Sequence, residues 1–386
     1  MIDLDVVSLR YRELRGAIPA ARIFYAVKAN PHRDVLTTLI GLGSSFDIAS
    51  RAELDLCLDL GVDPGSISYG NTIKRARDIA YAHARGVGLF AFDSEGELRK
   101  LAANAPGASV FCRVLVSGSG AQWPLSRKFG CEPDMALDLL RLARELGLRP
   151  CGLSFHVGSQ QLDPTRWREG VGLSAEIFRE LRGSGIELTV LNLGGGFPAR
   201  YDSGVPSIEN YAKSIRTVLE EEFGDSVPEL IAEPGRFLVG DAGVLRSQVL
   251  LISRKSYTES QRWVYLDVGR FGGLAETENE AIVYPLSVRR GETAIPVGTG
   301  TSGGPAGGGE RGPVVLAGPT CDSVDIMYEE TPRYFPLDLA VDDYVDFLNA
   351  GAYTATYSSV GFNGFPPLAT HCFGGPDARP DSPGGG

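Results

Sequence analysis

Eight short apolar segments recur along the first two-thirds of the chain, and the long gaps between them carry amphipathic stretches. This alternation is typical of buried parallel strands joined by helices. We expect strands at 23–28, 45–48, 67–69, 89–92, 110–114, 152–157, 190–193 and 230–232. Helices are expected at 51–60, 73–85, 134–146, 167–182 and 208–223. The pattern predicts an α/β fold whose first domain is a (β/α)8 TIM barrel over residues 10–236.

The pattern changes after Gly235, where β-rich segments follow one another without a strong helical period. Such segments lie at 237–253, 262–267, 314–317 and 344–349. They predict a second, mostly antiparallel β domain, of the sandwich or barrel kind, over residues 237–373, which residues 1–9 could join. Segment 298–312 and the tail 374–386 are rich in Gly, Pro and Ser, cannot bury apolar surface, and are expected to be a disordered loop and a disordered tail.

The bulk composition narrows the function classes. The 386 residues carry a formal net charge of −11, which argues against nucleic-acid or anionic-membrane partners. Six scattered cysteines, no CxxC pair and four histidines argue against a metal site and favour reduced thiols in the cytoplasm. Residues 1–10 lack the pattern of a signal peptide, and no apolar run reaches the ~18 residues of a membrane span.

Three chemically distinctive side chains fall at predicted strand ends, where a (β/α)8 barrel places its active site. Lys28 ends the first strand and is either a lysine that reaches solvent or a Schiff-base lysine whose pKa burial has lowered. Asp47 ends the second strand and could equally be a helix N-cap. His156 ends the sixth strand, either as a core residue or as a flat ring that stacks on an aromatic cofactor.

The last two barrel strands run into motifs suited to an anion. Three successive glycines, Gly194, Gly195 and Gly196, can bring backbone N–H groups close to a phosphate, although a glycine triplet is more often a simple turn. Glu233 and Arg236 flank a Pro-Gly turn; a carboxylate can hold a pyridinium N–H and a guanidinium can bind phosphate, or the two can form an ordinary ion pair. Together with Lys28 and His156, this set matches the needs of pyridoxal 5'-phosphate (PLP).

The β-rich part adds two motifs, GPTCDSVDIM and GAYTATYSSVGFNGF. Cys321 lies beside carboxylates there and is either a proton donor, since thiols titrate near neutrality, or a small buried hydrophobic residue.

The motifs YAVKANP, SFDIAS, SFHVGS, GGGFP, EPGR, GPTCDS and GAY…FNGF together resemble those of the fold type III PLP decarboxylases, which act on ornithine, lysine, diaminopimelate or arginine. The resemblance spans roughly residues 3–368, and ISYGNTIK, WPLSRKFGC and LDVGRFGGLAET are similar to the bacterial ornithine decarboxylases in particular. It implies an alanine-racemase-like barrel followed by a β domain, and a homodimer with shared active sites.

The resemblance also implies roles for individual residues. It makes Lys28 the covalent attachment point of PLP, with His156 on the ring, Glu233 at the pyridine nitrogen, and Cys321 as the proton donor from the second subunit. The implied cofactor-binding residues are Lys28, Asp47, His156, Ser159, Gly194, Gly195, Gly196, Glu233, Gly235, Arg236 and Tyr353. The implied substrate-binding residues are Asp267, Cys321, Asp322 and Phe362, and Lys128 with Asp325 is the implied ion pair between subunits.

The sequence therefore predicts decarboxylation of a basic L-amino acid, with L-ornithine to putrescine and CO2 as the leading reaction. Lysine differs from ornithine by one methylene, worth only about 1–3 kcal/mol in a pocket, so lysine is a candidate substrate too. The sequence also leaves open a modified or carrier-linked ornithine-like substrate, a PLP racemase on the same barrel, and a catalytically inactive regulator. The cysteine of GPTCDS favours decarboxylation over racemisation.

Overall fold

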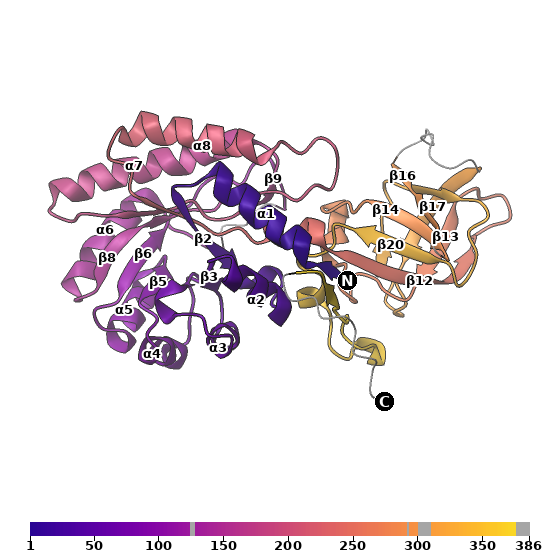
Figure 1. The fold of residues 1–386 in the computed structure, drawn as a ribbon, viewed down its shortest axis with the longest axis horizontal. Helices are drawn as coiled ribbons and strands as arrows, with labels where there is room; N and C mark the ends of the chain where they lie inside the picture. The colour runs from indigo at the N-terminus through magenta and orange to yellow at the C-terminus, as the bar shows by residue number, and fades with distance from the viewer. Residues whose placement is uncertain (124–127, 292, 300–309, 376–386) are drawn as a thin grey trace. The chain divides into compact units, whose positions relative to one another are not determined.

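The computed structural model describes residues 1–123, 128–291, 293–299 and 310–375 (Figure 1). These residues form two compact units. The barrel unit consists of residues 7–198 and 204–238, and the second unit consists of residues 1–6, 199–203 and 239–386. Among the described residues, no helix is both long enough and apolar enough to cross a bilayer.

The barrel unit is built on a closed sheet in which every neighbouring pair of strands is parallel. The strand order is β10-β11-β2-β3-β4-β5-β6-β8. The strands are β2 (Ala21–Ala26), β3 (Ser45–Ile48), β4 (Ile67–Tyr69), β5 (Leu89–Phe92), β6 (Ser109–Arg113), β8 (Arg149–Ser154), β10 (Val190–Asn192) and β11 (Glu229–Ala232). The predicted (β/α)8 barrel is confirmed, and each predicted strand overlaps one of these eight.

Helices follow the barrel strands, and α3, α4 and α5 lie along one flank of the sheet in Figure 1. The helices that the sequence predicted are α3 (Arg51–Asp59), α4 (Ala76–Ala84), α6 (Pro133–Glu145), α7 (Trp167–Gly183) and α8 (Ile208–Phe223). The structure adds α1 (Leu4–Ala17), α2 (Arg33–Gly41) and α5 (Glu95–Asn104). In α5 the apolar side chains buried are Leu98 and Leu101, so the apolar stripe is too narrow to stand out in the sequence.

An aromatic cluster fixes the end of β10. Trp167, at the start of α7, is fully buried and stacks on Phe197 with ring centroids 4.9 Å apart. Its indole Nε1 donates a hydrogen bond to the carbonyl of Leu193 at 3.1 Å. Tyr211 of α8 meets the indole edge-on and donates its hydroxyl proton to the Gln161 carbonyl. The cluster therefore anchors the residue that directly precedes the glycine triplet.

The second unit carries a mixed, mostly antiparallel sheet in the order β15-β14-β20-β12-β13-β17-β19-β16, with β18 paired to β17. The strands are β12 (Val244–Ser253), β13 (Arg262–Leu266), β14 (Leu286–Arg290), β15 (Thr293–Pro296), β16 (Gly298–Thr299), β17 (Arg311–Ala317), β18 (Ile326–Met327), β19 (Arg333–Pro336) and β20 (Tyr344–Leu348). The β13–β17 pair is parallel. The unit encloses its own core, which includes Val249, Leu266, Tyr284 and Phe347.

Two expectations from the sequence are wrong in part. The segment predicted as strand from 237 begins instead with a short helix, α9 (Arg236–Val239), and a 3-10 turn, because the chain first turns through Pro-Gly before β12 starts at Val244. The ends of the segment 298–312 are ordered, because β16 pairs with β19 and β17 begins at Arg311. Residues 300–309 and 376–386, on which the other disorder predictions fall, lie outside the described residues.

The N-terminal strand β1 (Ile2–Asp3) belongs to the second unit, where it pairs in parallel with β21 (Cys372–Phe373). The amino terminus donates a hydrogen bond to the Val244 carbonyl at 2.8 Å. The next residues, from 7 onward, lie in the barrel unit.

Candidate active site

Side chains with titratable groups gather at the C-terminal ends of the barrel strands. Lys28 lies in the 3-10 turn Val27–Ala29 directly after β2, and Asp47 lies in β3. His156 follows β8 by two residues, and Glu233 follows β11 by one. Since the C-terminal ends of parallel barrel strands share one mouth, these residues surround a common space.

The Lys28 amine faces three carboxyl groups. Its positive charge acts to lower the pKa of Asp47, Glu53 and Glu233. One interpretation of the sequence was a buried Lys28 whose pKa burial lowers. The expected burial is wrong, because Lys28 is exposed.

Asp47 is a buried acid with an unsatisfied oxygen. Burial, followed by the negative charge of Glu233, raises the pKa of Asp47 well above its usual value. Among the described residues, its Oδ1 is buried without a hydrogen-bond partner. A side chain on Gly70 would place its Cβ 2.0 Å from this Oδ1, so the turn after β4 needs glycine at that position. Ser50 rather than Asp47 caps the following helix.

Glu233 is oriented by the amide of Asn192. The Nδ2 of Asn192 donates to Glu233 Oε1 at 2.5 Å, while the Oδ1 of Asn192 accepts the backbone N–H of Gly194 at 2.9 Å. Burial raises the pKa of Glu233, and the Asn192 hydrogen bond and the charges of Lys28 and Arg113 oppose that rise. One fully buried amide therefore fixes both the carboxylate and the start of the glycine loop.

His156 presents a neutral ring. Burial, together with the positive charges of Arg113 and Lys28, holds the pKa of His156 well below its usual value. The backbone N–H of Gly158 donates to Nδ1 of His156 at 3.0 Å, which makes Nδ1 the acceptor and assigns the proton to Nε2. A neutral, oriented imidazole suits packing against a flat heteroaromatic ring better than an imidazolium would beside Lys28 and Arg113.

The glycine triplet forms a tightly packed cradle. A Cβ atom added at any of the three glycines would clash with a backbone carbonyl oxygen. The distance would be 2.1 Å from Gly194 to Phe155, 2.6 Å from Gly195 to Glu233, and 2.5 Å from Gly196 to Gly158. Gly194 and Gly196 also adopt positive φ angles of 66° and 100°. Only glycine fits at these positions, which lets the backbone approach a ligand closely.

Arg236 stands at the start of α9, after the turn that contains Gly235. The Arg236 side chain is almost fully buried, and its Nε and Nη2 donate to the Ser159 hydroxyl at 3.3 and 3.2 Å. A buried guanidinium and a hydroxyl that converge are suited to a phosphate.

Sequence reasoning missed Arg113, Glu53 and Asn192. Arg113 ends β6, where burial lowers its pKa and the charges of Glu233, Asp93 and Asp47 oppose that change. A charged residue at the end of an apolar strand was the signal that singled out Lys28, and VFCRV carried the same signal.

Glu53 was hidden because Ser50 and Glu53 form a capping box: the Ser50 hydroxyl accepts the Glu53 N–H, and Glu53 accepts the Ala49 N–H at 2.6 Å.

The second unit presents Cys321 and Asp322 on an exposed loop. The Cys321 N–H donates to Asn363 Oδ1 at 3.1 Å, and the Val324 N–H donates to Asp322 Oδ1 at 3.0 Å. Asp325 holds the loop from within: its buried carboxylate accepts the Thr320 hydroxyl at 2.7 Å and the Arg270 N–H at 2.8 Å. These contacts fix the backbone that carries the thiol and the carboxylate.

The predicted ion pair between subunits joins Lys128 to Asp325. Lys128 is exposed, with its Nζ 5.0 Å from the Phe129 ring centroid, and the Asp325 carboxylate has its partners in Thr320 and Arg270. The pairing of Lys128 with Asp325 stays a prediction.

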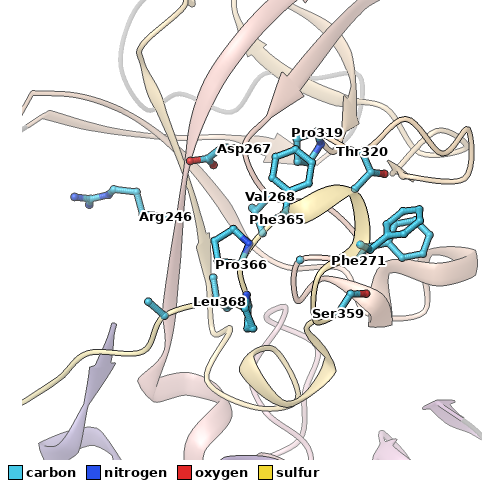
Figure 2. Close-up of a pocket in the computed structure, with 14 residues that line it drawn as sticks. Arg246, Asp267, Val268, Phe271, Pro319, Thr320, Ser359, Phe365, Pro366 and Leu368 are labelled. Carbon is cyan, nitrogen blue, oxygen red and sulfur yellow. The ribbon is translucent and has the colours of Figure 1, made fainter.

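A pocket of about 250 Å³ opens beside this loop in the second unit (Figure 2). Arg246, Asp267, Thr320 and Ser359 contribute polar atoms, while Phe271, Phe362 and Phe365 contribute aromatic surface. The charge of Arg246 is paired with Asp346 at 2.8 Å. The Ser247 hydroxyl and the Gln248 N–H both donate to Oδ1 of Asp267, at 2.5 and 2.9 Å, and the Asp267 side chain is exposed. A carboxylate beside aromatic rings suits an ammonium group. Tyr353 also lies in this unit, with its ring centroid 5.7 Å from that of Tyr357.

The residues of the barrel mouth fit PLP. Glycine N–H groups with no room for side chains, together with Ser159 and Arg236, suit the phosphate. The neutral ring of His156 suits the face of the pyridine, Glu233 suits its nitrogen, and Lys28 supplies a primary amine. The donor set is that of a PLP site rather than of a metal site.

Comparisons with known proteins agree with this geometry. Residues 4–240 match the model of the pyridoxal-dependent decarboxylases, pyridoxal binding domain. A lysine/ornithine decarboxylase from Selenomonas ruminantium is 34% identical over 364 residues, which cover 94% of this chain and 86% of that protein. The solved lysine/ornithine decarboxylase from Vibrio vulnificus, complexed with putrescine, aligns with a TM-score of 0.82 at 32% identity over 96% of this chain and 93% of that one.

A solved structure of SrLDC in complex with PLP and cadaverine aligns with a TM-score of 0.84 at 32% identity, over 97% of this chain and 89% of that one. The chain therefore belongs to the pyridoxal-dependent decarboxylases. It is a PLP-dependent enzyme that decarboxylates a basic amino acid.

Proposed function

We propose that the enzyme converts L-ornithine to putrescine and CO2 in a homodimer whose active sites combine residues of both subunits. The observation that carries the proposal is the exposed pair Cys321–Asp322 on a loop that Asp325 and Asn363 hold in place. A thiol and a single carboxylate next to one another supply what a diamine-forming decarboxylase needs: a proton for the reacting carbon and an anion for the distal ammonium group.

Each residue then has a defined task. When bound, PLP supplies the electron sink that accepts the pair left behind as CO2 departs. Lys28 holds the cofactor covalently, the cradle of Gly194–Gly196, Ser159 and Arg236 binds its phosphate, and Tyr353 adds a further contact. Glu233, oriented by Asn192, pairs with the pyridine nitrogen.

The substrate residues come from the second unit. The partner's Asp322 binds the distal ammonium group, which Asp267 and Phe362 support. The partner's Cys321 transfers its proton to the α-carbon. The Lys128–Asp325 pair joins the two subunits.

Lysine is the second candidate substrate, because one relative is named a lysine/ornithine decarboxylase and a similar structure contains cadaverine. The test is CO2 release from PLP-loaded enzyme with L-ornithine, L-lysine, L-arginine and meso-diaminopimelate, with Lys28→Ala as the inactive control. The highest kcat/KM with ornithine supports the proposal. A higher value with lysine, or turnover of none of the four, overturns the ornithine assignment.

The shared active site has its own test. Mixed Lys28→Ala and Cys321→Ala subunits should regain about a quarter of the wild-type activity, because about half of the dimers are mixed and each mixed dimer holds one intact site. If the mixture stays inactive under conditions that exchange subunits, each site is contained in one subunit.

A further inference from the structure

A second pocket, apart from the residues of the candidate active site, opens on the barrel unit and has a volume of about 720 Å³. Its walls are the segment after β3 (Ala49–Ala52), the segment after β4 from Asn71 to Asp78, and Lys100 of α5. Its volume is in the range of small-molecule sites, which are about 300–1,000 Å³.

The lining of this pocket is strongly basic. Five of its side chains are cationic: Arg51, Lys74, Arg75, Arg77 and Lys100. Asp78 is the acid among the lining residues. This is unusual for a chain with a net charge of −11, because its surface is otherwise expected to repel anions.

The carboxylates near the pocket leave cationic charge unmatched. Glu97 is shared by two lysines, since its Oε1 lies 3.1 Å from Lys74 Nζ and its Oε2 lies 2.5 Å from Lys100 Nζ. Arg51 lies 3.5 Å from Asp55. Arg77 lies 3.8 Å from Asp78 and keeps most of its side chain exposed. Arg75 is exposed and, within the described part of the chain, contacts no carboxylate. Arg75 and Arg77 therefore remain available to an external anion.

The backbone adds to the same potential. Helix α4 begins at Ala76, beside the pocket, and its N-cap position is occupied by Arg75, whose side chain caps no N–H group. The N-terminal end of a helix carries a partial positive charge and exposed N–H donors, so an anion is favoured there. Asp78, in the first turn of α4, offsets part of this charge, so the pocket combines cationic side chains with a helix start that has no side-chain cap.

We propose that this pocket binds a small phosphorylated molecule, with Arg75 and Arg77 contacting the phosphate groups and Arg51 and Lys100 contributing at the rim. Arginine guanidinium groups bind phosphate oxygens in bidentate geometry, which is the chemistry that this lining offers. The site is separate from the PLP phosphate cradle, which is formed by Gly194–Gly196, Ser159 and Arg236.

The pocket is close in the chain to a residue of the active site. Gly70, next to the lining residues Tyr69 and Asn71, donates its N–H to the Ile48 carbonyl at 3.1 Å and packs against Asp47. A ligand held by the segment that follows Gly70 therefore bears on the backbone that holds Asp47.

The test uses the PLP-loaded enzyme, so that the cofactor's own phosphate cradle is filled, and inorganic pyrophosphate as the probe in titration calorimetry. We expect saturable binding in the wild-type enzyme and an affinity lower by on the order of tenfold or more in Arg75→Gln/Arg77→Gln, since two charge-assisted contacts are lost. Both side chains are exposed, so the variant should fold, which circular dichroism checks. Arg216→Gln, an exposed arginine on α8, is the matched control and should bind as the wild type does.

Absence of binding up to millimolar pyrophosphate overturns the proposal. Equal binding by the double variant also overturns it, because the anion would then occupy another site. Neither result bears on ornithine turnover, so the two proposals fail independently. A parallel titration with ATP distinguishes a nucleotide from a free polyphosphate: tighter binding of ATP, lost in the double variant, supports a nucleotide in this pocket.

Discussion

Replacing Asn192 with alanine removes the contacts that orient Glu233 and the glycine loop together. The side chain donates to Glu233 Oε1 at 2.5 Å and accepts the Gly194 N–H at 2.9 Å, and it is fully buried. Alanine leaves a buried carboxyl group and a buried N–H group without these partners. Water has little access to replace them, so both losses should appear in the activity.

The larger loss concerns the carboxylate. A hydrogen bond to a charged group contributes about 1.5–3 kcal/mol, and here it opposes the rise in the pKa of Glu233 that burial causes. Without it the pKa rises further, and the proton affinity of Glu233 increases roughly 10- to 100-fold. A raised pKa means that Glu233 stays protonated to a higher pH. The neutral acid cannot pair as an anion with the pyridine nitrogen, so the acidic limb of the kcat/KM profile should move to higher pH.

The assay is kcat/KM against pH for the wild type and Asn192→Ala, with PLP affinity measured by titration of the stripped enzyme. Asn210→Ala, an exposed asparagine on α8, is the matched control and should leave both unchanged. PLP affinity should fall as well, because the Asn192 amide holds the Gly194 N–H and so fixes the start of the glycine loop that forms the proposed phosphate cradle. An acidic limb and a PLP affinity equal to those of the wild type would refute the positioning role of Asn192.

Three further predictions concern other residues. Lys28→Ala should lose the visible absorption of bound cofactor and nearly all turnover, and retained activity would contradict its assignment. Asp322→Ala should raise KM for ornithine roughly 10- to 100-fold with little change in PLP affinity, and an unchanged KM would remove it from the substrate site. Glu97→Gln should lower the free energy of unfolding at pH 7 by about 3–5 kcal/mol, because it leaves the buried amine of Lys74 without its ionic partner. Burial lowers the pKa of Lys74 to about 8, below that of the unfolded chain, so the free energy of unfolding should rise as pH passes from 8 towards 10.5. The stability lost in Glu97→Gln should therefore be smaller at pH 10 than at pH 7. An equal loss at both pH values in urea unfolding would contradict this reasoning.

The barrel could be predicted from the sequence because its strands are short apolar runs with no competing helical pattern. Segments such as SFDI and LFAF are bounded by turns, and the structure places strands at the same residues. Helix α5 escaped detection because Leu98 and Leu101 alone supply its apolar stripe. A helix or strand can therefore be predicted from the local sequence when its apolar residues recur with a strong period. It cannot be predicted when contacts with the rest of the fold, rather than this period, stabilise it.

The candidate site could be predicted only where a residue type was unusual for its position. Lys28, Glu233 and the glycine triplet stood out against apolar strands. Asn192 did not, because an asparagine in VLNL does not reveal that its amide joins a carboxylate to a loop; that contact depends on the register between β10 and β11. The exposure of Lys28 could not be foreseen either, because it depends on what surrounds the mouth rather than on the strand itself.

The division of labour between the two units has an evolutionary consequence. The residues assigned to the cofactor, Tyr353 apart, belong to the barrel unit, and those assigned to the substrate belong to the second unit. Under the proposed assignments, substitutions in the loop that carries Asp322 change the substrate preference while the barrel residues that bind PLP stay the same. This separation allows related enzymes to evolve different substrate preferences through changes in the second unit alone. We expect a chimera that carries the second unit of a relative to have that relative's substrate preference.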